Sequence, residues 1–225
     1  MKLILENWRK YTLTEGMMTV DDMIKLGDNV FIKIDEKNYA RSGKGVTISY
    51  VDASGKDLGW RSDGYTTEGP WGVVQITKDR RYSQSSHADD GECGKAWRIA
   101  SSEASSGWGP LLYDVAMEYA TMKGGGLTAD RGSVSKEAYA VWNYYLNNRG
   151  DVSSSQLDDL DNTLTPKINS DNCAQEVPKS HKSIPWSESP LSKRYTKAPD
   201  TINKLKETNK LWKKQSMFKW PWGKK

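Results

Sequence analysis

The chain has 225 residues, of which 36% are hydrophobic and 28% are charged, and its formal net charge is +4. With a mean hydropathy of −0.78 and no apolar run near the roughly 20 residues that cross a bilayer, the composition argues against a membrane-spanning protein and predicts a soluble one. The opening Met1-Lys-Leu-Ile-Leu-Glu6 reaches an acidic residue too soon for a secretory signal, so export is not expected. This length suits one sizeable domain with extensions.

The cysteines and histidines form no recognisable metal or redox motif. Cys93 and Cys173 are far apart and lack C-x-x-C spacing, which favours free thiols in a reducing compartment over a disulfide. His87 and His181 are equally isolated. Two cysteines and two histidines without close pairing make a poor zinc site, so no metal site is predicted.

The first 27 residues are expected to be a helical segment. Apolar residues recur at helical spacing over residues 1–11, with charged residues on the other face. Thr19 can cap a second short helix over Val20–Leu26, and Gly27 can end it. A first strand is then predicted over Val30–Ile34.

The next stretch has the alternation and turn residues of β-structure. Gly45–Val51 alternates branched and polar residues, Ala53–Lys56 supplies turn chemistry, and Leu58–Trp60 is expected to return as a hairpin. Pro70–Thr77 is a further predicted strand. The polar, charged segment Lys78–Gly94 is predicted to be a long loop.

A strand and a helix are predicted on either side of a Gly-X-Gly turn. Ala96–Ser101 is strand-like, and Pro110 stands at the first turn of a helix that Gly124-Gly-Gly126 ends. Its expected inward face is Leu111, Leu112, Val115, Tyr119 and Met122.

A short strand and another helix follow. Leu127–Asp130 is a predicted return strand, and either Ser133 or Ser135 can cap a helix over Lys136–Arg149. The inward face of this helix is expected to include Ala138, Val141, Trp142 and Tyr145.

After Gly150 the composition shifts to Ser, Asp, Asn and Pro, with little periodicity before Thr201–Leu211. The expected organisation is therefore a helical segment over residues 1–27, a domain over 28–150 and an extended C-terminal region over 151–225. Asn203–Lys225 holds eight Lys and one Glu, a local charge of +7, so the basic balance belongs to this tail.

The turn at Gly107-Trp-Gly109 is a candidate anion site. Backbone N–H groups at the start of a helix lack intrahelical acceptors, and the helix dipole places about half a positive charge there. Glycines let an anion approach these N–H groups closely. The chain is therefore expected to bind a ligand that carries phosphate.

The order of elements over about Cys93–Arg149 resembles the acyl-CoA-binding half of the GNAT superfamily of N-acyltransferases. The likeness rests on a strand, a Gly-X-Gly turn, a helix, a short strand and a helix beginning Ser-X-X-Ala with an aromatic residue four positions later. It implies an α/β (α+β) fold with a mixed, mostly antiparallel sheet and flanking helices. It also implies binding of acetyl-CoA or another acyl-CoA, with acyl transfer to an amine acceptor.

The resemblance implies where the cofactor lies. In this family the fourth strand parts from the fifth, the pantetheine arm lies in the gap, and pyrophosphate sits on a Q/R-x-x-G-x-G/A loop. Ala104 stands at the Q/R position here. The residues expected to hold pyrophosphate are Ser106, Gly107, Trp108, Gly109 and Leu111, and those expected to pair with pantetheine are Ile99, Ala100 and Ser101.

The resemblance also suggests catalytic residues. The family's last helix carries a tyrosine that protonates the departing thiolate, but Trp142 stands at the matching position. Tyr144 and Tyr145 are nearby substitutes, and Tyr145 is the candidate acid because it lies roughly in line with Trp142 on the helix. Glu103 is the candidate acceptor of the amine proton, directly or through water; alternatively it is a solvated loop residue. Asp130 and Arg131 can orient a substrate, pair with each other or cap the next helix.

The remaining features leave other functions open. Leu211–Lys225 interleaves cations with aromatics, which suits docking on this protein or a protein partner, and also nucleic-acid or membrane contact. The opening residues and Ser189–Thr196 loosely resemble uncharacterised tailed-bacteriophage proteins, which implies a bacterial host cytoplasm or a virion. Ala104 and Trp142 favour the competing function, a non-catalytic phage structural or interaction protein on a degenerate GNAT scaffold.

Overall fold

A computed structural model describes residues 17–27, 29–39, 43–58, 60–61, 64–65, 70–78, 92–129, 134–158, 161–172 and 184–213. The expected helix over residues 1–11, most of the loop before Gly94, the pair Asp130 and Arg131, and tail residues 214–225 lie outside the described residues. Among the helices described, none has the length and apolar character needed to cross a membrane.

The short helix α2 (Val20–Lys25) forms as its sequence predicts. The Thr19 side chain accepts a hydrogen bond from the Asp22 N–H at 3.2 Å, and the Asp22 carboxylate accepts one from the Thr19 N–H at 3.2 Å. This reciprocal pair satisfies two N–H groups that the helix itself cannot. Gly27 follows with a φ of +74°, which suits glycine at the end of the helix.

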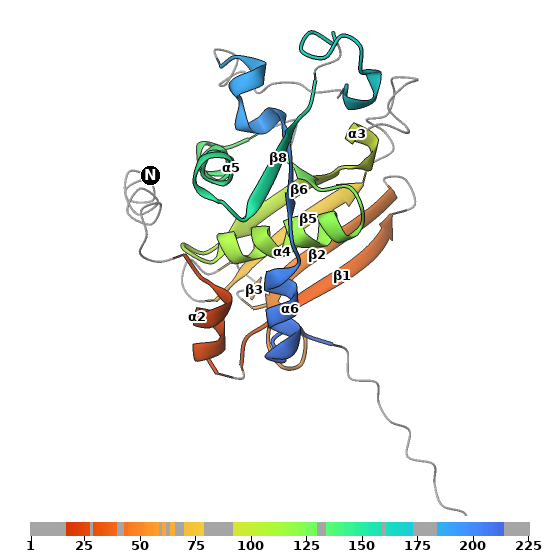
Figure 1. The fold of residues 1–225 in the computed structure, drawn as a ribbon. Coiled ribbons are helices and arrows are strands. Elements are labelled where there is room, and N and C mark those ends of the chain that lie inside the picture. The colour runs from red at the N-terminus through yellow and green to blue at the C-terminus, as the bar shows by residue number, and fades with distance from the viewer. Residues whose placement is uncertain are drawn as a thin grey trace, which may run out of the picture.

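Seven strands form one sheet in the order β1-β2-β5-β6-β7-β9-β8 (Figure 1). Neighbours are antiparallel except β6 and β7, which are parallel. This confirms the expected mixed, mostly antiparallel sheet with flanking helices. The strands are β1 (Phe31–Tyr39), β2 (Gly43–Val51), β5 (Gly72–Lys78), β6 (Trp97–Ala104), β7 (Leu127–Thr128), β8 (Val152–Gln156) and β9 (Lys193–Lys197), and a separate pair is β3 (Trp60–Arg61) with β4 (Gly64–Tyr65).

The helices connect these strands and cover the sheet. The α-helices after α2 are α3 (Glu92–Lys95), α4 (Gly109–Met122), α5 (Lys136–Asn148) and α6 (Asp200–Glu207), and the 3-10 turns are η2 (Asn169–Asp171), η4 (Trp186–Glu188) and η5 (Pro190–Ser192). The helix α3 occupies the end of the stretch predicted to be a loop. Ser135 is the cap of α5, because its side chain accepts from the Ala138 N–H at 3.1 Å.

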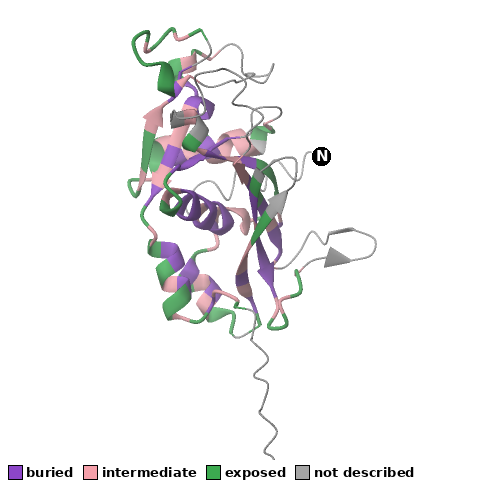
Figure 2. Ribbon diagram, turned by 90° about the vertical axis from the view of Figure 1, so that its right-hand side faces the viewer, coloured by how far each residue is buried: buried purple, intermediate pink, exposed green. Residues whose placement is uncertain are grey.

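Helix α4 lies against one face of the sheet and is buried on nearly all sides (Figure 2). It also contacts β9 and α6, so it is enclosed by the sheet and by the C-terminal elements. Its predicted inward face is correct except for Met122, which is 54% exposed in the last turn. The enclosure also buries residues that a one-sided amphipathic pattern does not predict, namely Tyr113, Ala116, Met117, Glu118 and Ala120.

The region after Gly150 is not only an extension. Strand β9 lies between β7 and β8, so the domain continues beyond the expected boundary. The sequence of β8 is Val-Ser-Ser-Ser-Gln, which lacks an apolar alternation because β8 is a partly exposed edge strand held by backbone pairing. Composition therefore did not reveal it.

The first residues of the tail dock on the opposite edge of the sheet. Leu211 pairs with Ile32 of β1 in a parallel bridge, and the Trp212 Nε1–H donates to the Ala53 carbonyl oxygen at 3.3 Å. Lys33 Nζ lies 5.3 Å from the centre of the Trp212 ring. This tryptophan thus packs on the protein itself and protects part of an edge strand.

The prediction of free cysteines is wrong. Cys93, in α3, is disulfide-bonded, and the only other cysteine in the chain is Cys173, outside the described residues. The Cys93 sulfur lies 3.0 Å from the Asp171 carbonyl oxygen, so the fold brings α3 next to η2. Sequence spacing did not reveal this approach, because it is made by the packing of distant segments. Disulfides persist in oxidising compartments, so the cysteines do not support a reducing one.

Candidate functional site

Strand β7 is only two residues long, and both residues pair with the start of β6. The register joins Trp97 to Leu127 and Arg98 to Thr128, after which β6 continues to Ala104. Among the described residues no strand pairs with this edge of β6 beyond Arg98. The backbone of the later β6 residues is therefore open on one side, where an extended ligand could add to the sheet edge.

A β-bulge lies in β6 shortly after the residues that pair with β7. On the other edge of β6, Gln75 pairs with Ser101 and Ile76 with Ile99, which leaves Ala100 as an extra residue. Bulges re-aim neighbouring groups and are frequent near binding sites. Ile99, Ala100 and Ser101, the three residues expected to pair with pantetheine, thus lie just beyond the part of β6 that pairs with β7.

Two adjoining cavities follow the open edge of β6. The first has a volume of about 260 Å³ and lies among β6, α4 and α5, with Ile99, Ala100, Ser101 and Trp142 in its wall. The second, also about 260 Å³, reaches Gly109 and Pro110 at the start of α4 and includes Glu103. Ser102, Tyr113, Ser135 and Ala138 line both cavities.

The loop before α4 is held by its carbonyl groups. Gly107 has a φ of +82°, a conformation that requires glycine. Its carbonyl oxygen accepts from the Met18 N–H at 2.9 Å, and the Trp108 carbonyl oxygen accepts from the Tyr50 hydroxyl at 2.8 Å. Because a trans peptide directs C=O and N–H to opposite sides, the Gly109 N–H points away from Tyr50.

Trp108 does not offer its own N–H, contrary to expectation. That N–H donates to the Ser105 carbonyl oxygen at 3.1 Å, and the indole ring packs edge-on against the Tyr50 ring with centroids 5.1 Å apart. The ring is held there because Tyr50, fully buried in β2, offers both a ring face and a hydroxyl donor.

The start of α4 has room for an anion. The N–H of Gly109 donates to no backbone acceptor in the described part of the chain. A Cβ on Gly109 would meet only the Ala104 Cβ, at 3.7 Å, so the protein's own packing does not require glycine there. The first turn of α4 contains no acidic residue. These features suit a negatively charged group at the helix N-terminus.

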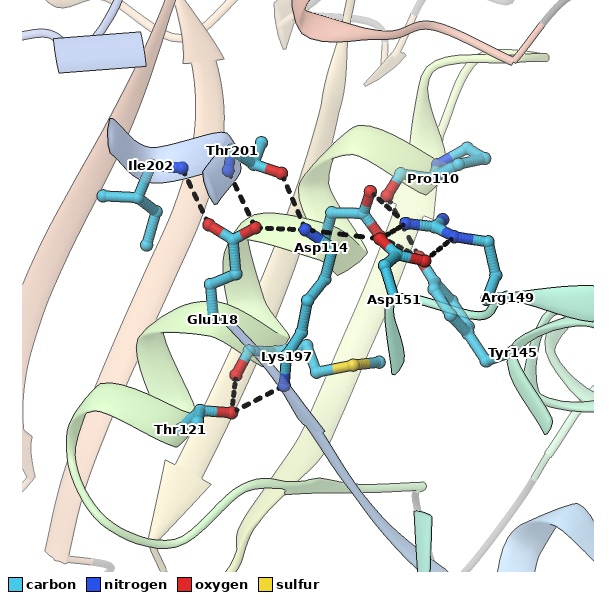
Figure 3. A network of polar contacts seen from close by, with 11 residues as sticks. Pro110, Asp114, Glu118, Thr121, Tyr145, Arg149, Asp151, Lys197, Thr201 and Ile202 are labelled. Atoms are coloured by element: carbon cyan, nitrogen blue, oxygen red, sulfur yellow. Dashed lines mark hydrogen bonds and ion pairs between the residues drawn. The ribbon is translucent and has the colours of Figure 1, made fainter. Parts of the chain in front are cut away.

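Tyr145 is not placed to act in the cavities, which corrects its assignment as candidate acid. Its hydroxyl donates to Asp114 Oδ1 at 2.8 Å and lies 3.3 Å from the Pro110 carbonyl oxygen (Figure 3). Burial, followed by the nearby charge of Asp114, raises the pKa of Tyr145 well above its ordinary value. Tyr145 lines neither cavity. Helical rotation alone did not reveal that α4 supplies this carboxylate acceptor.

The other expected residues have mixed outcomes. Trp142 is 1% exposed, stacks on Tyr195 with ring centroids 4.9 Å apart, and closes one side of the first cavity. Glu103 is exposed on β6 and lines the second cavity, a position compatible with both the catalytic and the solvated interpretation. The Cβ of Ala104 packs closely against Gly72. A Cβ added to Gly72 would lie only 2.7 Å from the Ala104 Cβ, and this close contact favours a small residue at position 104.

Two hydroxyl groups at the junction of the cavities were missed. Tyr113 and Ser102 lie with their hydroxyl oxygens 2.8 Å apart. The sequence did contain a signal for Tyr113, because it follows Gly109 by four residues and therefore lies on the same face of the helix. Among the described residues, no group of three or more His, Cys, Asp or Glu side chains is placed to hold a metal ion.

Beside the site, Arg149 bridges two carboxylates and makes stability dependent on pH. Its Nη2 lies 3.0 Å from Asp114 Oδ2 and 2.7 Å from Asp151 Oδ2. The hydrogen bond from Arg149 lowers the pKa of Asp151 from 3.8 to about 2. Because the folded pKa lies below the unfolded one, this stabilisation is present above about pH 4 and is lost as the pH falls toward 2.

We therefore expect Asp151→Asn to lower the free energy of unfolding at pH 6 by on the order of 1 kcal/mol, a value reduced for solvent screening of this half-exposed side chain. The difference from the unmodified protein should shrink on acidification toward pH 2. Urea unfolding at several pH values measures this. An equal difference across the whole range would show that the Arg149 contact does not act through charge.

No family model matches the chain, and neither the curated proteins nor the solved structures contain a match. Function is therefore inferred from the residues of the site and their geometry.

Proposed function

We propose that this protein binds acetyl-CoA or a similar acyl-CoA between β6 and β7 and transfers the acyl group to an amine. The observation that carries the proposal is the edge of β6 beyond Arg98, with which no described strand pairs and along which two cavities lead to the start of α4. The donor supplies an activated acyl thioester. The resemblance of residues 93–149 to GNAT acyltransferases points to the same ligand.

Each part of such a ligand has suitable groups in the chain. The Gly109 N–H and the dipole of α4 attract the diphosphate. The open backbone of Ile99, Ala100 and Ser101 can pair with the amide groups of the pantetheine arm, as a sheet edge pairs with an added strand. Glu103 can accept the proton that the amine loses, directly or through water.

A second candidate function is non-catalytic binding on the same scaffold. Trp142 stands where the family's tyrosine would donate a proton, and the hydroxyl of Tyr145 is held by Asp114. Both features favour a protein that keeps the ligand cleft and lacks the usual acid. Release of free thiol from acetyl-CoA in the presence of a panel of amines separates transfer from binding alone.

Gly109→Ala is the sharpest test of ligand binding. The added Cβ fits the protein but would keep the diphosphate from approaching the N–H closely, so we expect acetyl-CoA affinity to fall about 10- to 100-fold, as for loss of one hydrogen bond to a charged group. Isothermal titration calorimetry measures this. Folding should be unaffected or slightly stabilised, because alanine is a better helix former than glycine.

Gly150→Ala is the matched control, because a Cβ there would meet nothing within 4 Å. It should bind acetyl-CoA like the unmodified protein. The proposal fails if the unmodified protein does not bind acetyl-CoA, or if Gly109→Ala binds it equally well.

A further inference from the structure

The junction of the two cavities is lined by hydroxyl groups rather than by charged ones. Ser102, Tyr113 and Ser135 line both cavities. Of these, only tyrosine is a useful proton donor near neutral pH, because its ordinary pKa is about 10 while aliphatic hydroxyls are far weaker acids. Tyr113 is therefore the candidate proton donor at this junction.

Tyr113 is held firmly at this junction. Tyr113 lies on α4, one helical turn after Gly109, and is 5% exposed. Its ring meets the Trp142 ring edge-on with centroids 5.8 Å apart, and its hydroxyl oxygen lies 2.8 Å from Ser102 Oγ on β6. The hydroxyl thus reaches from α4 toward the open strand, beside the indole that replaces the expected tyrosine.

Three other buried tyrosines nearby are not part of the cavity walls. The hydroxyl of Tyr50 donates to the Trp108 carbonyl oxygen, that of Tyr145 to Asp114, and that of Tyr195 to the Pro190 carbonyl oxygen at 2.6 Å. None of these three lines either cavity. Tyr113 differs because its neighbour Ser102 is itself an exposed cavity-lining residue.

We propose that Tyr113 is the proton donor to the departing sulfur, an inference that rests on the acyl transfer proposed above. As the amine nitrogen bonds to the acyl carbon and the carbon–sulfur bond breaks, Tyr113 gives its hydroxyl proton to sulfur, and Glu103 takes the proton from nitrogen. That proton then returns from Glu103 to the Tyr113 oxygen through water, so both side chains regain their starting states. Ser102 is a positioning residue that holds the Tyr113 hydroxyl.

The test uses Tyr113→Phe, which removes the hydroxyl and keeps the ring contact with Trp142. Acetyl-CoA affinity should stay within about twofold, while thiol release should fall about 100-fold, the lower end of the effect of a general acid. Tyr144→Phe is the control, because Tyr144 is on α5 and lines neither cavity. It should match the unmodified protein.

A second measurement does not depend on turnover. The ultraviolet absorption of the thiolate follows the ionisation of the thiol of CoA bound to each variant. A hydroxyl that donates to sulfur favours the thiolate, so in Tyr113→Phe the titration midpoint of bound CoA should rise by about one pH unit. Ser102→Ala should raise it by less, because the tyrosine hydroxyl remains.

The outcomes separate the two proposals. If the unmodified protein binds acetyl-CoA and releases thiol, but Tyr113→Phe changes neither the rate nor the titration midpoint, the role of Tyr113 is overturned and acyl transfer stands. If acetyl-CoA binds but no amine prompts thiol release, the proposed acyl transfer is overturned. In that case an unchanged titration midpoint of CoA bound to Tyr113→Phe would also overturn the contact of Tyr113 with sulfur. Absence of acetyl-CoA binding would overturn both.

Discussion

Replacing Glu118 with Ala should lower the free energy of unfolding by about 3–5 kcal/mol, the usual cost of removing one partner of a buried ion pair. The carboxylate of Glu118 is fully buried and forms an ion pair with Lys197 of β9, whose side chain is 4% exposed (Figure 3). Without Glu118 the buried Lys197 ammonium would keep only its longer ion pair with the partly exposed Asp151, at 3.6 Å. The loss of charge compensation accounts for most of the expected effect.

Glu118 also substitutes for a helix cap. Its oxygens accept from the Thr201 N–H at 2.9 Å and the Ile202 N–H at 2.7 Å, at the start of α6. The preceding Pro199 provides no side-chain cap, so a residue of α4 satisfies N–H groups that α6 cannot satisfy itself. The same change therefore weakens the attachment of α6 and β9 to the rest of the fold.

Urea unfolding followed by circular dichroism measures the effect. Asp21→Ala is the control, because Asp21 forms an exposed ion pair with Lys204 of the same helix α6, and such pairs contribute at most about 1 kcal/mol. The double variant Glu118→Met, Lys197→Met should recover much of the loss, since it leaves no buried charge. If Glu118→Ala cost no more than Asp21→Ala, the buried network would not stabilise the fold.

Trp142→Ala should be similarly costly, at about 3–5 kcal/mol, because it deletes a large buried side chain and leaves a cavity. The indole stacks on Tyr195 and meets the rings of Tyr113 and Tyr145, so one residue of α5 joins α4, α5 and β9. Aromatic contacts add to the loss from burial alone.

The same unfolding measurement tests this prediction. Trp142→Phe should cost much less, because a ring remains between the neighbouring tyrosines. Tyr144→Ala serves as a control on the same helix, at a half-buried position. A loss below about 1 kcal/mol for Trp142→Ala would contradict a tightly packed aromatic cluster, because full burial of an aromatic side chain predicts more.

Local signals predicted the elements where the interactions are themselves local. Thr19 and Asp22 cap α2 within four residues, and the Ser135 side chain caps α5 through the N–H of Ala138. The Gly-X-Gly turn before α4 formed as expected because Gly107 needs its positive φ. The elements over residues 97–148 thus followed from caps, turns and periodicity.

The details of the candidate site depend on contacts between distant segments. Tyr145 and Trp142 were both correctly placed on the inward face of α5, but the sequence could not show that Asp114 accepts the Tyr145 hydroxyl. Likewise, the sequence could not show that the Tyr113 hydroxyl lies next to Ser102 of β6. Facing inward is a property of helical period, whereas the partner depends on the neighbouring element.

Sequence alone determined the order of the central elements and the glycine turn before α4, because each depends on propensities and hydrogen bonds within a few residues. The class of fold was implied by the resemblance that this order of elements carries. Only the tertiary structure decided that β8 and β9 complete the sheet, that Cys93 is disulfide-bonded, and that β7 pairs with β6 over only two residues. These features depend on packing between segments tens of residues apart, and local patterns in the chain do not encode which segments meet.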